Sequence, residues 1–384
     1  MKTVKLKDIS INNRGYYGIG ASAVDYDENK FTYLRITDIN DDGSLNKNGL
    51  MSVDDEKSDQ YLLEKNDIVF ARTGASTGRN YFYDGEINNM VYAGFLIKFS
   101  LNPELVNPKF IKYYCLSKKY SDWISSSLTG STRPNINEKQ LSEMPIELPD
   151  RFYQDKVVGI LDSISQKIQL NSETNNNLRE LCKTNYLRIV EENSVEISLS
   201  ELMDYQGGSQ PPASEFQKEK NEDNIRFVQI RDFETDSYIC YIPNSNKNKL
   251  CNKDDILIAR YGASLGRICY GLSGAYNVAL AKVLPKKAEY KELLRVILES
   301  DDFYNYINQV GQRSAQAGFN VGDIAGYTVI IPNENGLKVF NNISKNIIDK
   351  RLLMIEENRK LSELRDTLLP KLLNGEIDLG NIEI

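Results

Sequence analysis

The chain contains no histidine, and its five cysteines are scattered without a Cys-x-x-Cys pair. The missing histidine excludes Ser-His-Asp and Cys-His catalysis as well as histidine-ligated metal sites. Because the thiols are odd in number and unpaired, we expect reduced, partly buried cysteines and neither disulfides nor a zinc site. These cysteines are Cys115, Cys182, Cys240, Cys251 and Cys269.

Long apolar runs and a basic excess are also missing. No apolar run approaches the ~18–20 residues that a membrane span needs, and Met1–Lys5 lacks the apolar core of a signal peptide. We therefore expect a cytoplasmic protein. The formal net charge of −7 argues mildly against a chain that binds nucleic acid alone. Acidic clusters such as 54–56 and 215–223 are interpreted as solvated loops, and no metal site is predicted.

One motif is present twice. Ala71–Arg79 reads Ala-Arg-Thr-Gly-Ala-Ser-Thr-Gly-Arg, and Ala259–Arg267 reads Ala-Arg-Tyr-Gly-Ala-Ser-Leu-Gly-Arg, 188 residues later. Upstream, 36–39 matches 230–233 at an offset of 194, and downstream 131–137 matches 314–320 at 183. The repeated unit is about half of the 384 residues, far longer than a solenoid repeat of roughly 20–50. The chain therefore contains a duplicated domain.

Each copy ends in a short strand that proline closes, at Pro149 and Pro332, and a long helix is predicted to follow. Asp150 and Asn333 are placed to cap these helices. A heptad pattern runs along both, which favours pairing of the helices as a coiled coil over packing of each against its own domain. The seam positions are Val157, Leu161, Ile164, Ile168, Asn171, Asn175 and Leu178 in the first helix, and Phe340, Ile347, Met354, Asn358, Leu361 and Leu368 in the second.

Asparagines within such a seam fix the register of the two helices at some cost in stability. Here they are Asn171, Asn175 and Asn358. From Val157 to Cys182 the first helix is predicted to be ~39 Å long, equivalent to ~11–12 base pairs of DNA. We therefore expect a rigid spacer between two β-rich modules.

The glycine loop is the first candidate binding element. It lacks the Gly-Lys-Ser/Thr ending of a P-loop, and strands are predicted on both sides (67–72 and 79–83), so a hairpin explains its glycines. A hairpin does not explain the flanking arginines, which beside hydroxyl groups suit phosphate or base-edge contacts. The predicted DNA-binding residues here are Arg72, Thr73, Ser76, Thr77 and Arg79, with Arg260, Tyr261, Ser264 and Arg267 in the second copy.

The second candidate is the polar segment after the predicted helices 110–116 and 293–298. Arginine, glutamine and asparagine offer the bidentate geometry that reads guanine or adenine, although a polar turn explains each residue about equally well alone. Because the two copies differ here, we expect this segment to distinguish sequences. The candidates are Ser131, Thr132, Arg133, Asn137, Arg313, Ser314, Gln316 and Asn320, with Tyr17, Ser209 and Gln210 from the module openings.

Together these features resemble the specificity subunit of type I restriction–modification systems. The resemblance rests on the two half-repeats, the doubled arginine–glycine stretch and the Ser-Thr-Arg-Pro-x-Ile turn at 131–136. Tyr17-Gly18-Ile19 and the closing segment 364–377 also look like the family.

The resemblance implies an α+β fold with two duplicated β-rich target-recognition domains, separated by two long antiparallel helices that form a coiled coil. The expected boundaries are 1–150 and 194–333 for the domains, and 151–193 and 334–384 for the spacer helices. Each domain is expected to read one half of a bipartite site in double-stranded DNA.

The same resemblance implies that the helices position two adenine methyltransferase subunits, which hold S-adenosylmethionine, and that motor-endonuclease subunits can join for host defence. The chain itself is then a non-catalytic subunit without a cofactor. Two other functions remain open on sequence grounds: a coiled-coil adaptor whose β modules bind proteins, and an enzyme that binds a nucleotide at the glycine loop.

Overall fold

The computed structural model describes residues 1–380 except 48, 129–133, 193 and 312–317. Its contacts divide the chain into two compact units. The first unit combines Met1–Gln166 with Ser362–Ile384, and the second is Lys167–Leu361. Each unit thus contains one β-rich module and a part of both long helices.

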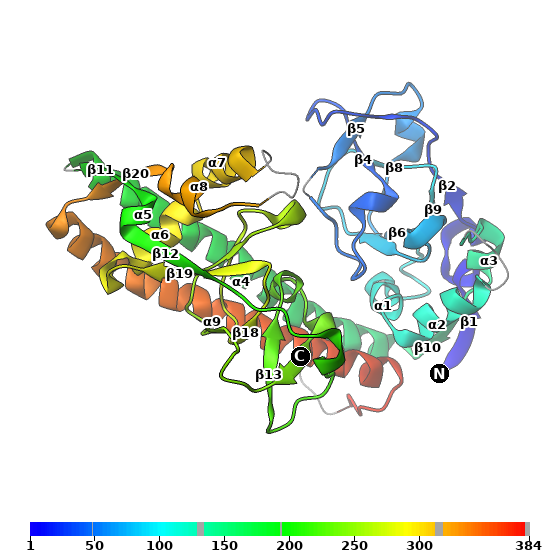
Figure 1. Ribbon diagram of the computed structural model, residues 1–384. Coiled ribbons are helices and arrows are strands. Elements are labelled where there is room, and N and C mark those ends of the chain that lie inside the picture. Colours follow the sequence, from blue (N-terminus) through cyan, green and yellow to red (C-terminus); the bar gives the residue numbers. More distant parts are fainter. Residues whose placement is uncertain (48, 129–133, 193, 312–317, 381–384) are drawn as a thin grey trace. The chain divides into compact units, whose positions relative to one another are not determined.

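The module of the first unit contains two four-stranded sheets (Figure 1). One has the order β2 (Tyr16–Tyr17), β9 (Leu96–Ser100), β6 (Asp67–Ala71), β7 (Asn80–Tyr83). The other has the order β3 (Ala23–Val24), β5 (Met51–Val53), β4 (Phe31–Leu34), β8 (Met90–Tyr92). The pair β4–β8 is parallel, and the other pairs in these sheets are antiparallel.

Short helices cover the first of these sheets and supply the larger part of the core. They are α1 (Pro108–Tyr114), α2 (Lys118–Ser127) and α3 (Glu138–Ser142), and β1 (Lys2–Lys5) pairs with β10 (Pro145–Leu148) beside them. Phe70, Phe99 and Phe110 are fully buried where sheet and helices meet. The side chain of Asn107 accepts a hydrogen bond from the Lys109 amide and so begins α1.

The second unit repeats this arrangement. Its sheets have the orders β12 (Met203–Gly207), β19 (Leu280–Pro285), β16 (Leu257–Ala259), β17 (Ile268–Cys269), and β14 (Cys240–Pro243), β13 (Asn224–Val228), β18 (Gly274–Tyr276), β15 (Leu250–Cys251). The helices are α5 (Leu199–Leu202), α6 (Lys291–Leu298), α7 (Asp301–Gly311) and α8 (Val321–Ala325), and β11 (Ser194–Ser198) pairs with β20 (Thr328–Pro332). The parallel pair is again present, as β13–β18. The duplication is therefore one of fold as well as of sequence.

The two long helices are α4 (Arg151–Glu192) and α9 (Glu334–Leu373) (Figure 1). Both predicted caps are confirmed: Asp150 accepts from the Tyr153 amide at 2.9 Å, and Asn333 accepts from the Gly336 amide at 2.9 Å. Among the described residues no helix is long and apolar enough to cross a membrane.

The helices are antiparallel within each unit. In the first unit the Tyr153 hydroxyl donates to the Leu372 carbonyl at 2.9 Å. In the second, the ring of Tyr186 contacts that of Phe340 at 6.4 Å. Residues early in α4 thus face residues late in α9, and the reverse, as an antiparallel pair requires.

Two hydrogen bonds give the helix pair an internal two-fold relation. The Asn175 side-chain amide donates to the Arg351 carbonyl at 2.9 Å, and that of Asn358 donates to the Ile168 carbonyl at 3.2 Å. Both donor and acceptor differ by 183 residues between the two bonds, which is the offset between the copies. The same contact is therefore made twice, once by each copy, and it suits the predicted role of these asparagines in fixing register.

Most seam positions are buried to some extent in their own units. Val157, Leu161 and Phe340 are fully buried, Ile164, Asn171 and Met354 are nearly so, and the remaining positions are half-buried (Ile168, Asn175, Leu178, Ile347, Asn358, Leu361, Leu368). Asn171 donates to both Asn358 and Glu357 at 2.8 Å. The polar centre of the seam is therefore hydrogen-bonded across the pair.

Candidate nucleic-acid interface

The glycine loop is a tight hairpin in both modules. Gly74 and Gly78 have φ of 71° and 92°, and Gly262 and Gly266 have φ of 71° and 82°. Left-handed backbone of this kind favours glycine, because a side chain would strain it. The two copies of the motif therefore encode one and the same turn.

Backbone hydrogen bonds already occupy amide groups that a phosphate-binding loop would need. The amide of Gly78 donates to the Ala71 carbonyl at 2.8 Å, and that of Arg79 donates to the Ser76 carbonyl at 2.9 Å. The Gly74 amide is taken by the Pro134 carbonyl at 3.0 Å. A phosphate cradle needs such N–H groups free and convergent. The loop is consequently a framework hairpin.

The segment after the second polar stretch pairs with this hairpin in both modules. Asn135 bridges Thr73, and Gly318 bridges Tyr261 in the same antiparallel manner. The predicted base-reading residues just before these bridges lie outside the described residues: Ser131, Thr132, Arg133, Arg313, Ser314 and Gln316. The structure thus places the end of each polar segment beside the hairpin.

Two predicted base-reading residues, Asn137 and Asn320, cap helices. The Asn137 side-chain oxygen accepts from the Gln140 amide at 2.9 Å and begins α3. The Asn320 oxygen accepts from the Gly322 amide at 2.7 Å and begins α8. Because a capping oxygen is already occupied, bidentate reading of adenine by either residue would break its cap. We therefore assign both to helix capping.

The four duplicated arginines divide into two pairs. The guanidinium groups of Arg72 and Arg260 lie against aromatic rings: Arg72 lies over the Tyr17 ring at 5.1 Å, and Arg260 lies 5.0 Å from the Tyr261 ring and 5.8 Å from that of Tyr205. The Nε atom of each is buried and has no hydrogen-bond partner. No carboxylate pairs with either guanidinium within the described part of the chain. Both charges are left uncompensated.

The charges of the other two arginines, Arg79 and Arg267, are already neutralised by carboxylates. Arg79 forms an ion pair with Asp41 at 2.6 Å and also donates to the Ile39 carbonyl at 3.3 Å. Arg267 forms an ion pair with Glu234 at 2.5 Å. Asp41 and Glu234 belong to loops far away in sequence that have diverged, yet both modules pair this arginine. These two arginines therefore tie the hairpin to the neighbouring loop.

The remaining predicted residues surround the hairpin or the module opening. Thr77 donates to the Gly74 carbonyl at 2.7 Å, and the carbonyls of Ser76 and Ser264 accept from the arginine that follows each by three residues. The Tyr17 hydroxyl accepts from the Glu138 amide at 3.1 Å, although 44% of this side chain is exposed. Thr73 and Tyr261 form the bridges described above.

At the second opening, Ser209 and Gln210 contact Asn277. The Ser209 backbone bridges Asn277, and the Gln210 side-chain oxygen accepts from the Asn277 amide at 2.5 Å. Gln210 is exposed and Ser209 half-buried. Both residues are therefore at a surface, but their placement depends on a loop that comes later in the sequence.

A close approach of two loops explains why the openings contain glycine. A Cβ at Gly18 would lie 2.2 Å from the Tyr92 carbonyl oxygen, and one at Gly208 would lie 2.2 Å from the Asn277 carbonyl oxygen. Since these two glycines are structurally equivalent, Tyr17 corresponds to Gly207. A Cβ at Gly207 would lie 2.9 Å from Nη1 of Arg260. The guanidinium of Arg260 therefore lies close to a position that is filled by a side chain in the first module.

An aspartate–lysine ion pair near the start of the strand that leads into each hairpin is also present in both modules. Asp67 pairs with Lys98 at 3.0 Å, and Asp255 pairs with Lys282 at 3.3 Å. Burial raises the pKa of Asp67 above the usual range of a carboxyl group, although Lys98 opposes that shift. We therefore assign a structural role to both aspartates, each of which precedes the repeated motif by four residues.

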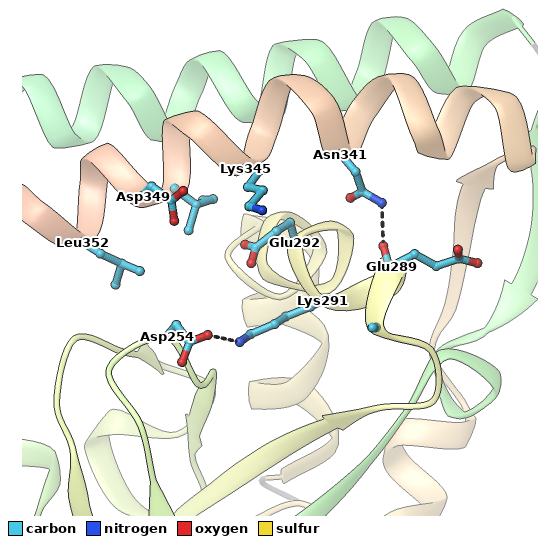
Figure 2. A pocket seen from close by; sticks show the side chains of 10 residues that line it. Asp254, Glu289, Lys291, Glu292, Asn341, Lys345, Asp349 and Leu352 are labelled. Carbon is cyan, nitrogen blue, oxygen red and sulfur yellow. Dashed lines mark hydrogen bonds and ion pairs between the residues drawn. The ribbon is translucent and has the colours of Figure 1, made fainter.

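The second unit also has a pocket of about 310 Å³ between α9 and the segment before α6 (Figure 2). Some of its polar groups engage one another: Lys291 pairs with Asp254 at 2.5 Å, and Asn341 donates to the Glu289 carbonyl at 2.9 Å. No aromatic ring lines it for a base to stack on. Within the described residues no group of histidine, cysteine or acidic side chains could hold a metal ion. Neither feature favours a nucleotide or metal site.

Comparisons with known proteins agree on one family. Residues 1–180 match the family model described as "Type I restriction modification DNA specificity domain". The type I restriction enzyme HindI specificity subunit of Haemophilus influenzae is 21% identical over 82% of this chain and 87% of its own length. The MjaIX specificity subunit of Methanocaldococcus jannaschii is 21% identical over 70% of this chain and 69% of its own length.

A solved structure extends the likeness to nearly the whole chain. The type I restriction-modification system S subunit from M. genitalium has 18% sequence identity and a TM-score of 0.58, covering 97% of this chain and 95% of that one. At this identity the match concerns the fold. Both the resemblance recognised in the sequence and the predicted fold class are confirmed.

Proposed function

We propose that this chain, a type I restriction–modification specificity subunit by sequence and fold, is the DNA-recognition subunit of such a complex. Each β-rich module, 1–150 and 194–333, reads one half of a bipartite site in double-stranded DNA. The helical segments 151–193 and 334–384 position two adenine methyltransferase subunits, and motor-endonuclease subunits can join. The chain performs no catalysis itself, and we expect it to act in the cytoplasm, where its DNA lies.

One observation supports this proposal above the others. Both modules present the same hairpin with one arginine, Arg72 or Arg260, that has no carboxylate partner among the described residues. The residue bridged to each hairpin, Asn135 or Gly318, closely follows in sequence a polar segment that differs between the copies. Phosphate contacts fix the position of a protein on DNA, whereas contacts with base edges distinguish sequences. A retained cation beside a diverged segment is the arrangement that two readers of different half-sites need.

The residues divide accordingly. We assign Arg72 and Arg260 to phosphate contacts, supported by the hydroxyl groups of Thr73, Ser76, Ser264 and Tyr261. Base reading is assigned to Ser131, Thr132 and Arg133, to Arg313, Ser314 and Gln316, and to the module openings at Tyr17, Ser209 and Gln210. Arg79 and Arg267 approach DNA only if Asp41 or Glu234 releases them.

The acidic net charge of −7 bears on affinity. Few uncompensated cations face the DNA in this proposal, so the chain alone binds DNA weakly, because each phosphate contact contributes to the electrostatic part of the affinity. Tight binding depends on the methyltransferase subunits. Tight, salt-resistant binding by the isolated chain would count against this view.

The experiment is methylation by a reconstituted complex. The chain is mixed with its methyltransferase subunits, S-adenosylmethionine and genomic DNA, and methylated adenines are mapped with and without the chain. We expect one bipartite motif to be methylated only when the chain is present. Methylation that does not depend on the chain, or has no sequence preference, would refute the proposal.

A further inference from the structure

A buried polar network ties the second module to the helix pair. Arg351 on α9 has 2% of its surface exposed and holds both carboxylate oxygens of Glu299, at 3.0 and 3.1 Å. It also donates to the Tyr270 hydroxyl and to the Asn175 side-chain oxygen, the latter at 3.1 Å. Three separate elements of the second unit therefore meet at one guanidinium: α4, the end of α6 and the segment after β17.

The network continues into the module. The Tyr270 hydroxyl donates to Glu299 at 2.7 Å, and the fully buried Arg295 lies 4.5 Å over the Tyr270 ring. Arg295 in turn donates to Glu292 at 2.8 Å and to the Asp254 carbonyl at 2.8 Å. The side chains that bind the Arg351 guanidinium are thus themselves fixed by further contacts within the module.

The first copy of the repeat has none of these groups at the equivalent positions. The 183-residue offset maps Arg351 onto Ile168 and Glu299 onto Leu116, and the 188-residue offset of the hairpin maps Tyr270 onto Phe82. An Arg–Glu–Tyr cluster in one copy thus corresponds to Ile–Leu–Phe in the other. Apolar residues suffice for this fold, so stability alone does not demand the charged cluster.

The energetics of buried ion pairs also indicate that stability does not require this cluster. Burying an ion pair costs desolvation energy that its attraction barely repays, and apolar replacements of similar size are often as stable or more so. An ion pair differs from an apolar contact in direction, because a planar guanidinium meets a carboxylate side by side at one angle only. The cluster therefore restricts orientation more than it adds stability.

We propose that Arg351 is a positioning residue for recognition of the second half-site. Through Glu299 and Tyr270 it holds the second module at one angle on the α4–α9 pair, and so fixes the spacer length at which the second half-site is accepted. This inference rests on the proposed function. It concerns how strictly the complex measures the spacer and does not concern which bases are read.

The test uses the reconstituted complex and a series of duplexes in which the spacer is lengthened or shortened by one or two base pairs. The main variant combines Arg351→Ile, Glu299→Leu and Tyr270→Phe, which installs all three residues of the first copy. We expect a melting temperature close to that of the wild type, with the preference for the native spacer reduced at least about tenfold. Displacement by about 1 Å is enough for rate losses up to ~100-fold.

Two further variants separate positioning from folding. Arg351→Lys retains the charge but not the two-pronged geometry, so an intermediate loss of spacer preference is expected without loss of folding. Lys253→Ala with Glu356→Ala removes an exposed ion pair at 2.7 Å between the same module and the same helix. That control should leave spacer preference unchanged, because exposed pairs contribute little.

The outcomes are distinct. If the wild-type complex is selective for spacer length and both Arg351 variants fold and remain equally selective, Arg351 does not position the module, and the proposed function still stands. If the wild-type complex methylates no specific site, the proposed function itself fails. A loss of selectivity in the control as large as in the Arg351 variants would also overturn the inference.

Discussion

The two modules share one fold but are attached to the helices differently. In the first unit, Val157, Leu161 and Leu372 join the apolar core of the module, and the polar contacts there include the partly exposed ion pair of Lys109 with Asp162 at 2.5 Å. In the second unit Phe340 and Ile348 join the core, but a buried Arg351–Glu299 pair is added. The difference teaches that duplication retained the apolar framework, while the ionic contacts between module and helices differ between the copies.

At one pair of equivalent positions the signs of the two charges are exchanged between the copies. Lys109 and Asp162 correspond through the 183-residue offset to Glu292 and Lys345, so an acid stands where a base stood and the reverse. Glu292 pairs instead with Arg295. Ionic contacts can be redrawn in this way because they depend on few side chains, whereas a packed core changes only at a larger cost.

The largest expected effect comes from Gly18→Ala and Gly208→Ala. A Cβ at either position overlaps a carbonyl oxygen at 2.2 Å, so each change should lower the free energy of unfolding by about 3 kcal/mol or more. We expect each variant to abolish selectivity for its own half-site and to spare the other, measured by methylation of sites altered in one half.

The matched control is Gly20→Ala, where a new Cβ meets no atom within 4 Å. It should leave stability and both half-sites nearly unchanged. Loss of both half-sites in either glycine variant would show that the modules do not act separately.

The next effect compares the two duplicated aspartate–lysine pairs. The Asp67 side chain is 1% exposed and that of Asp255 is 19% exposed. Lys98→Met should therefore destabilise by about 3 kcal/mol, because it leaves a buried carboxylate unpaired, while Lys282→Met should destabilise by about 1 kcal/mol. Chemical denaturation of the two variants measures the difference, and equal losses would contradict the assigned role of burial.

A smaller effect sharpens the comparison between the arginine pairs. Arg72→Ala and Arg260→Ala should each weaken DNA binding by the complex about tenfold, uniformly across sequences, and reduce the salt slope by ~0.9. Arg79→Ala and Arg267→Ala are the controls and should have little effect on the slope, since each already has a carboxylate partner. A change in sequence preference with Arg72→Ala would mean that this residue reads bases.

The smallest effect tests the internal two-fold relation. Asn175→Ala and Asn358→Ala each remove one of the two equivalent amide–carbonyl bonds between the helices, and each also removes a side-chain oxygen that accepts from Arg351 or from Asn171. Each should cost about 1–3 kcal/mol. Thermal melts of the two variants should agree within about 0.5 kcal/mol, and a severalfold difference would show that the two bonds are not equivalent in energy.

Features that repeat in the chain could be predicted from sequence. The doubled hairpin, the long helices with their caps at Asp150 and Asn333, and the heptad seam all follow from local patterns. The fold class followed from their order. These are signals in which neighbouring residues carry the information, so spacing alone reveals them.

Contacts between distant segments could not be predicted. Asp41 and Glu234, which neutralise Arg79 and Arg267, lie in diverged loops, so no shared motif marks them. The capping contacts of Asn137 and Asn320 could not be told from base contacts in the sequence, because an asparagine in a polar turn suits either role. The buried Arg351 network joins four elements whose proximity only the folded chain establishes.

The most direct measurement maps methylated adenines in a library of randomised DNA treated with the reconstituted complex. Two modules that read separately predict two short blocks of fixed bases, separated by a spacer of constant length in which any base is allowed. One continuous recognised block, or methylation without a recognised sequence, would contradict the account.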